Sequence, residues 1–178
     1  MESIEKEIGG IDILVNNAGI QRRHPLENFP DKDWNDLIHT NLSGAFFVRK
    51  AVVKGMISRR SGKIINICSM QSEVGRPSIA PYAAAKGGLK MFTRAMTVEW
   101  AKYNIQINGL GPGYLITDMT RPLAEDPKFD AWIKGRTPAG RWGDPVELVG
   151  TAIFLASEAS NFINGQIIYV DGGILAGI

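Results

Sequence analysis

The fold is decided by the stretch from Lys63 to Lys86, which reads Lys-Ile-Ile-Asn-Ile-Cys-Ser-Met-Gln-Ser-Glu-Val-Gly-Arg-Pro-Ser-Ile-Ala-Pro-Tyr-Ala-Ala-Ala-Lys. It begins with a strand-sized apolar run, Lys63 to Cys68, and leads into a helical run from Ala80 to Tyr103. The same order recurs along the chain, with strand-like runs at 11–16, 105–110 and 166–170 and helical runs at 31–59 and 144–157. This alternation predicts one α/β domain over residues 1–178, built on a parallel sheet that helices cover.

The helical run at 144–157 has a well-defined start. Asp144 is placed as N-cap, Pro145 as first helical residue, and Glu147 for the reciprocal bond of a capping box. Residues 117–142, in contrast, form the least regular stretch, rich in proline and charge. It lies where a mobile cover over a site is expected.

Composition narrows the class of protein. The chain has 178 residues and 44% hydrophobic content, enough for a substantial core. Its 20 Lys and Arg residues nearly balance 18 Asp and Glu residues, so a nucleic-acid partner gains no electrostatic support. The apolar runs are too short to cross a membrane, and we expect a cytoplasmic protein. Cys68 is the only cysteine; a reactive thiol is conceivable, but a buried core residue is the favoured interpretation.

Tyr82 and Lys86 carry the strongest indication of function. They are four residues apart, so on a helix they share one face, where an ammonium group favours a neighbouring phenolate. A free tyrosine titrates near pH ~10, and a lowered pKa makes it a usable general acid or base at neutral pH. Ser69, in the same unit, can hydrogen-bond a substrate carbonyl or hydroxyl. The alternative is a solvated helix face that carries Tyr and Lys by chance.

Further motifs flank these three residues. The run Asn16-Asn17-Ala18-Gly19 follows an apolar strand, Asn41 lies within residues 40–44 (Thr-Asn-Leu-Ser-Gly), and Pro112-Gly113 leads to Thr117. In this order, the motifs resemble the classical short-chain dehydrogenase/reductase family from Ile11 to Gly173. Within that family, residues 16–25, 67–73 and 136–144 are similar to gluconate 5-dehydrogenases.

The resemblance implies catalytic roles for four residues. Ser69 orients and polarises the reacting oxygen, and Tyr82 exchanges the proton. Lys86 lowers the pKa of Tyr82 and holds the hydroxyls of the nicotinamide ribose. Asn41 bends its helix and holds a water connected to Lys86, although an Asn inside a helix is equally well read as a local kink.

The resemblance also implies NAD(P)(H) as cofactor, with NADP slightly favoured. The residues expected to bind it are Asn17, Ala18, Gly19, Tyr82, Lys86, Pro112, Gly113, Leu115 and Thr117. Plain turns after strands account equally for Asn16 to Gly19 and for Pro112-Gly113.

For the substrate, an Arg near the site suits a sugar-acid carboxylate, because its planar fork binds that group at two points. Arg23 is the candidate, and Gln71 and Glu73 lie just beyond Ser69, where they can bond sugar hydroxyls beside Ser69 and Tyr82. Solvated loop residues are the alternative. His24 and His39 lack the spacing of a metal site, and we expect no metal.

One expected motif is absent from the sequence. A doubly wound, Rossmann-like parallel sheet normally opens with a glycine-rich turn before a helix that meets the pyrophosphate. This sequence contains no such turn, so we expect that fold to lack its first mononucleotide-binding half. The strand at 11–16 then lies at an unpaired apolar edge, and we expect a polypeptide of this length to bind dinucleotides weakly and to self-associate there.

These features predict an oxidoreductase that interconverts D-gluconate and 5-keto-D-gluconate. The alternatives are a ketoreductase acting on an acyl thioester and a catalytically silent, truncated relative that serves as a subunit or scaffold. A serine hydrolase through Ser69 is disfavoured because the sequence lacks a Gly-x-Ser-x-Gly elbow. The resemblance further implies a homo-oligomer, a tetramer or dimer, formed through the last helix and residues 166–173.

Overall fold

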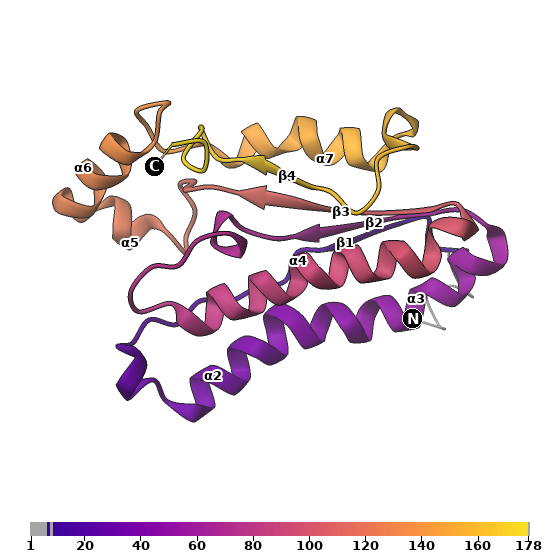
Figure 1. The fold of residues 1–178 in the computed structure, drawn as a ribbon, viewed down its shortest axis with the longest axis horizontal. Helices are drawn as coiled ribbons and strands as arrows, with labels where there is room; N and C mark the ends of the chain where they lie inside the picture. Colours follow the sequence, from indigo (N-terminus) through magenta and orange to yellow (C-terminus); the bar gives the residue numbers. More distant parts are fainter. Residues whose placement is uncertain (1–6, 8, 178) are drawn as a thin grey trace.

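A computed structural model describes residue 7 and residues 9–177 of the chain. Within these residues, the strands form one sheet in the order β1-β2-β3-β4, and every pairing is parallel (Figure 1). The strands are β1 (Ile13–Asn16), β2 (Gly62–Ile67), β3 (Ile105–Pro112) and β4 (Ile167–Val170). The predicted α/β fold with a parallel, Rossmann-like sheet is confirmed.

One face of the sheet is covered by the long helices of the first half of the chain (Figure 1). These are α2 (Asp31–Ile38), α3 (Gly44–Arg59) and α4 (Ala80–Trp100), and a π-helical segment, η2 (His39–Ser43), joins α2 to α3. The core on this face packs Met56 of α3 and Met96 of α4 against Ile64 and Ile107 of the sheet. Strands alternate their side chains between faces, so the next residues, such as Ile65, point to the opposite side.

That opposite face is covered by α7 (Val149–Ala156), whose Leu155 packs on Ile65 and Leu110. The strand order advances in one direction throughout, yet α7 lies across the sheet from α3 and α4 (Figure 1). The β3-to-β4 connection therefore has the opposite hand from the two before it. It is also the longest connection, since it carries two extra helices ahead of α7.

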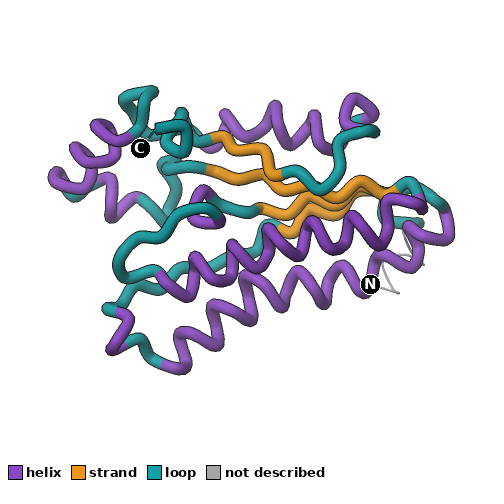
Figure 2. Tube along the Cα trace, viewed as in Figure 1, coloured by secondary structure: helices purple, strands orange, loops and turns teal. Residues whose placement is uncertain are grey.

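Those extra helices make residues 117–142 more regular than the sequence analysis predicts. They are α5 (Arg121–Ala124) and α6 (Pro127–Arg136) (Figure 2). Asp126 caps α6 by accepting hydrogen bonds from the amides of Lys128 and Phe129, with Pro127 in the first turn. The capping box at Asp144 and Glu147 is confirmed, although the turn it opens is a 3-10 helix, η5 (Pro145–Leu148), and α7 follows it.

The remaining short helices are η1 (Leu26–Asn28), η3 (Met70–Ser72), η4 (Ala101–Tyr103) and η6 (Glu158–Ser160). In the described part of the chain, β1 pairs only with β2 and so forms one edge of the sheet. Ile13 and Val15 are 46% and 50% exposed on one face of this edge, while Leu14 points into the core. No helix among the described residues combines the length and apolar character needed to cross a membrane.

Candidate active site

The carboxyl ends of β1, β2 and β3 meet at one edge of the sheet because the strands are parallel. The segments that leave these ends surround a cavity of about 540 Å³ together with the first turns of α4. Every residue predicted to bind the cofactor lines this cavity. The full lining is Asn17, Ala18, Gly19, Ile67, Cys68, Ser69, Tyr82, Lys86, Pro112, Gly113, Leu115, Thr117, Asp118, Met119, Thr120 and Leu148.

Ser69 and Tyr82 meet in this cavity from different elements. Ser69 follows β2 in an extended conformation and caps η3, with its Oγ accepting a hydrogen bond of 3.1 Å from the Gln71 amide. Tyr82 lies in the first turn of α4, and its phenol is close to the Ser69 hydroxyl. The hydrogen bond between them is an influence that, taken alone, lowers the pKa of Tyr82. The predicted grouping of Ser69 with Tyr82 is thus present.

Lys86 lies one turn further along α4 and is only 4% exposed. Its Nζ donates a hydrogen bond of 2.6 Å to the carbonyl oxygen of Ile67, at the end of β2. Burial lowers the pKa of this amine to about 8. An ammonium has three N–H donors, and the described residues provide one hydrogen-bond acceptor, so two donors remain for a ligand in the cavity.

The predicted lowering of the Tyr82 pKa by Lys86 is not seen in this structure and stays a prediction. Burial is the largest influence on the pKa of Tyr82, and it raises that pKa. The Lys86 Nζ lies 5.7 Å from the centre of the Tyr82 ring and bonds the Ile67 carbonyl. Spacing along a helix places the two residues on one face, but it does not fix where the ammonium points. Tyr82 is therefore a protonated phenol at neutral pH.

Asn41 holds the turn that follows β1. Its Oδ1 accepts a hydrogen bond of 2.8 Å from the Ile20 amide, and its Nδ2 donates one of 2.9 Å to the Ile20 carbonyl. A Cβ added to Gly19 would lie 3.3 Å from Asn41 Oδ1 and 3.8 Å from Lys86 Nζ, so glycine lets this turn sit against both groups. Asn41 lies within the π-helical segment η2, which interrupts the α-helical run where the bend is predicted. The water predicted between Asn41 and Lys86 stays a prediction.

A second cavity, of about 70 Å³, adjoins the first at Ser69 and Tyr82. It receives four of the five predicted substrate residues, namely Arg23, Ser69, Gln71 and Tyr82. Sequence reasoning missed Arg76 and Tyr114, which line it as well. The complete lining is Gln21, Arg23, Ser69, Met70, Gln71, Arg76, Ile79, Tyr82, Gly113, Tyr114, Met119, Thr120 and Leu123.

The sequence contains a signal that identifies Arg76 and Tyr114 as candidates. Arg76 lies between Ser69 and Tyr82 in the same strand-to-helix connection, and Tyr114 directly follows Pro112-Gly113. Each belongs to a segment that leaves the carboxyl end of a strand, where the residues of a site gather.

The structure corrects the prediction for Glu73, the fifth residue expected to contact the substrate. Its Oε2 accepts a hydrogen bond from Lys90 Nζ, and its Oε1 accepts one from the Tyr169 hydroxyl. Lys90 and Tyr169 lower the pKa of this carboxyl. With both oxygens engaged and no place in the lining of either cavity, Glu73 ties the loop after β2 to α4 and β4 instead of meeting a substrate.

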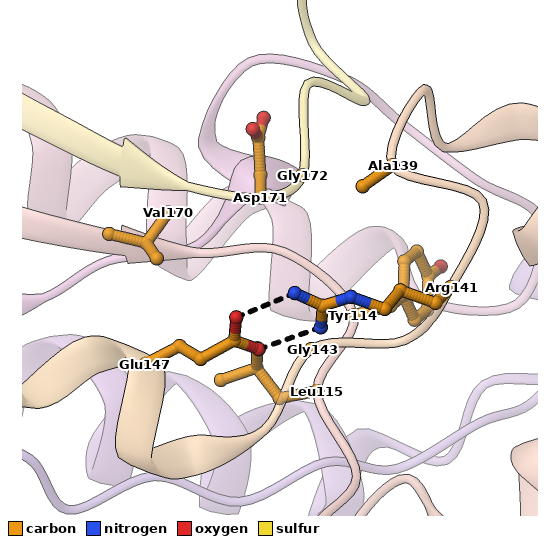
Figure 3. A pocket seen from close by; sticks show the side chains of 9 residues that line it. All are labelled: Tyr114, Leu115, Ala139, Arg141, Gly143, Glu147, Val170, Asp171 and Gly172. Atoms are coloured by element: carbon orange, nitrogen blue, oxygen red, sulfur yellow. Dashed lines mark hydrogen bonds and ion pairs between the residues drawn. The ribbon is translucent and has the colours of Figure 1, made fainter.

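The lining of a smaller pocket, of about 60 Å³, includes Tyr114 and Leu115 together with Arg141 and Glu147 (Figure 3). There Arg141 binds Glu147 at two points, with N–O distances of 2.8 and 2.7 Å. This pairing and the Asp144 amide lower the pKa of Glu147 to about 2. The charge of Arg141 is therefore already neutralised, which leaves this pocket without a free cation for an anionic ligand.

Cys68 also lines the larger cavity, but its side chain is buried. Burial raises the pKa of the thiol to about 11. The interpretation of Cys68 as a core residue is confirmed, since it packs with Ala45 and Leu89. No cluster of three or more His, Cys, Asp or Glu side chains suited to a metal occurs in the described part of the chain.

Comparison with known proteins assigns this geometry to a family. Residues 1–175 match a protein-family model described as enoyl-(acyl carrier protein) reductase. The 5-keto-D-gluconate 5-reductase of Escherichia coli strain K12 is 58% identical over 178 residues, which cover 100% of this chain and 70% of the relative. The chain belongs to the short-chain dehydrogenase/reductase family. The predicted enzyme class, an NAD(P)-dependent oxidoreductase, is thereby confirmed.

Two further relatives of this short-chain dehydrogenase/reductase are informative. The 2-dehydro-3-deoxy-D-gluconate 5-dehydrogenase of Formosa agariphila is 56% identical over 179 residues, which cover 100% of this chain and 68% of the relative. A crystal structure of a gluconate 5-dehydrogenase from Burkholderia cenocepacia J2315, in complex with NADP and tartrate, superposes with a TM-score of 0.98. That protein is 56% identical, and the match covers 99% of this chain and 69% of that one.

Proposed function

We propose that this short-chain dehydrogenase/reductase interconverts D-gluconate and 5-keto-D-gluconate with NADP(H) as cofactor. The observation that carries the proposal is that Ser69 and Tyr82 line both cavities at once. An oxygen atom held between them is reachable from a cofactor side and from a side that carries arginines. The 58% identity to a 5-keto-D-gluconate 5-reductase and the NADP in the Burkholderia relative support the same assignment.

The residues around the larger cavity fit a dinucleotide. Asn17 to Gly19 line one part of the cavity, and the small Ala18 and Gly19 allow an adenosine to approach the backbone closely. Lys86 has two N–H donors left for the vicinal hydroxyls of a ribose. Pro112, Gly113, Leu115 and Thr117 line the part assigned to the nicotinamide carboxamide and phosphate. Bound NADP(H) supplies or accepts the hydride at the substrate carbon.

Tyr82 transfers the proton to and from the reacting oxygen. Because burial keeps its phenol protonated at neutral pH, Tyr82 donates that proton to the C5 oxygen of the keto acid during reduction. Ser69 donates a hydrogen bond to the same oxygen and stabilises the charge that develops on it. Oxidation of gluconate runs these steps in reverse. Asn41 is a positioning residue, which acts through the Ile20 backbone and, as proposed, through a water toward Lys86.

The second cavity supplies the contacts for the sugar acid. Arg23 provides a cation for the carboxylate, and Gln71 provides an amide for the hydroxyls. A related substrate, 2-dehydro-3-deoxy-D-gluconate, is a second candidate because the Formosa relative is 56% identical. By name, both relatives react at C5 of a sugar acid.

Initial rates on three substrates, measured with a chain that also carries the glycine-rich half of the fold, test the proposal. The assay follows reduction of 5-keto-D-gluconate, oxidation of 2-dehydro-3-deoxy-D-gluconate and reduction of an acetoacetyl thioester, with NADP(H) and NAD(H) in turn. We expect the highest kcat/KM for 5-keto-D-gluconate with NADPH. The acetoacetyl thioester as best substrate would establish the ketoreductase alternative, and folded protein without turnover on any of them would establish a scaffold.

We further propose a cytoplasmic homo-oligomer, a tetramer or dimer. Support for an interface through the last helix comes from Val146, Val149 and Ile153, apolar residues that are exposed along η5 and α7. Apolar side chains gathered on one helix are typical of subunit contacts. Light scattering on Ile153→Lys against the unchanged protein tests this, and an unchanged mass would reject the helix as an interface.

A further inference from the structure

We propose that Arg76 and Arg23 form a guanidinium pair that binds the carboxylate of the substrate, and that Gln71 accepts a hydrogen bond from a neighbouring substrate hydroxyl. This inference rests on the proposed function and adds Arg76 as a specificity-determining residue. It assigns the second cavity to polyhydroxy carboxylates as a class, in preference to neutral polyols or simple fatty acyl groups.

The first argument is that these two arginines lack counter-charges. Neither Arg23 nor Arg76 has a carboxylate partner among the ion pairs of the described residues, and of the arginines without such a partner only these two line the second cavity. The Nε of Arg76 is buried without any hydrogen-bond partner in the described part of the chain. A buried N–H that lacks an acceptor is costly, and it is satisfied when a carboxylate enters the cavity.

The second argument is the electrostatic repulsion between Arg23 and Arg76. Both side chains line the same cavity, and after burial the charge of Arg76 is the next cause that lowers the pKa of Arg23. Tyr114 lines the same cavity, but burial raises the pKa of its phenol, so the phenol stays neutral and cancels neither charge. An anion that binds here relieves the repulsion and gains charge-assisted hydrogen bonds, whereas a neutral ligand gains neither benefit.

The third argument concerns how Arg76 is held. Its Cζ lies 4.9 Å from the centre of the Phe129 ring on α6, and Phe129 in turn meets Tyr114 edge-on at 5.8 Å. Stacking uses the flat face of a guanidinium and leaves the N–H groups in its plane free to bind. Phe129 on α6 therefore packs against the guanidinium of Arg76 and offers it no hydrogen-bond acceptor.

Gln71 identifies the ligand as more than a simple acid. Its side chain is 8% exposed, and its Oε1 has no hydrogen-bond partner among the described residues. Its Nε2 lies 3.5 Å from the Tyr114 hydroxyl, which is a weak contact. A buried, unused acceptor beside two cations matches a hydroxyl close to a carboxylate, as on the carbon chain of a sugar acid.

Thermal-shift titrations test the pair without requiring turnover. The probes are tartrate and threitol, which share a four-carbon skeleton but differ in that threitol carries hydroxymethyl groups where tartrate carries carboxylates. We expect tartrate to stabilise the unchanged protein and threitol to have little effect. Arg76→Gln should weaken tartrate binding by about 10- to 100-fold, and Arg76→Lys, which keeps the charge but loses the fork, by a smaller factor.

Arg22→Gln is the matched control, since it removes a neighbouring cation that faces Asp33 and does not line the cavity. It should leave tartrate binding within about twofold, within the scatter of surface substitutions. Equal losses in Arg22→Gln and Arg76→Gln, or none in Arg76→Gln, would overturn the pair. Because tartrate binding does not depend on catalysis, a protein inactive on gluconate that still binds tartrate through Arg76 would refute only the proposed function.

Discussion

The Nζ of Lys86 donates a 2.6 Å hydrogen bond to the carbonyl oxygen of Ile67, and so ties the second turn of α4 to the end of β2. The bond fixes a buried ammonium at the centre of the larger cavity. The ammonium of Lys86 is therefore bonded to the Ile67 carbonyl, and it lies 5.7 Å from the centre of the Tyr82 ring.

Burial of Lys86 gives the protein a distinctive pH dependence. Its folded pKa of about 8 lies below the ordinary value of 10.5, so the unfolded chain binds more protons between these pH values. Stability should therefore rise with pH across that window. Relative to Lys86→Met, the unchanged protein should gain about 3 kcal/mol from pH 8 to 10.5, at roughly 1.4 kcal/mol per pKa unit. Urea unfolding of both proteins at several pH values measures this, and a pH-independent difference would contradict it.

In a chain that also carries the glycine-rich half of the fold, Tyr82→Phe should abolish turnover while leaving NADP(H) binding nearly intact. The ring remains to shape the cavity, and only the proton carrier is lost. Tyr103→Phe is the control, because Tyr103 lies at the opposite end of the sheet, just before β3 begins. Steady-state rates and fluorescence titration with NADPH provide the two readouts. Substantial residual activity in Tyr82→Phe would refute its role.

Asn41→Ala should destabilise the fold by about 2–4 kcal/mol, because it leaves the amide and the carbonyl of Ile20 without partners. It should also raise the KM for NADPH, since the Asn17 to Gly19 turn loses its support against Lys86. Asn35→Ala, at an exposed position of α2, should leave both quantities unchanged. Chemical denaturation and cofactor titration measure the two effects. Loss of stability with an unaltered KM would restrict Asn41 to a structural role.

Arg23→Ala should raise the KM for gluconate about 10- to 150-fold, the effect of losing a charge-assisted hydrogen bond worth about 1.5–3 kcal/mol. The KM for a neutral polyol of similar length should change little. Equal effects on the charged and the neutral substrate would remove Arg23 from the site.

Glu73→Ala tests whether Glu73 contacts Lys90 and Tyr169 and does not contact the substrate. Its contacts with Lys90 and Tyr169 are partly solvated, so their loss should cost about 0.5–1 kcal/mol of stability. The KM for gluconate should stay unchanged, while Gln71→Ala raises it. A large rise in KM for Glu73→Ala would return this carboxylate to the substrate site.

The sequence predicts local features well because they depend on near neighbours. The capping box at Asp144 needs residues only three positions apart, and the strand runs follow from apolar periodicity. Glu73 was misread because its partners lie 17 and 96 residues away, a pairing that no local pattern reveals. Helix α6 was missed although Asp126-Pro127 is a regular helix start, since proline and charge were interpreted as irregularity.

The direction of the pKa shift of Tyr82 could not be predicted from the sequence for a different reason. Helical spacing brings Lys86 to the same face, but burial of the phenol depends on the whole site. The pairing of Arg76 with Arg23 likewise requires two loops that leave different strands, β1 and β2, to converge.

The most direct measurement is isotope transfer from NADPH carrying deuterium at C4 to 5-keto-D-gluconate, read by NMR of the product. In a chain that also carries the glycine-rich half of the fold, the account predicts D-gluconate with deuterium at C5 when Tyr82 is present and no such product with Tyr82→Phe. Deuterium at another carbon, or product formed equally by Tyr82→Phe, would contradict it.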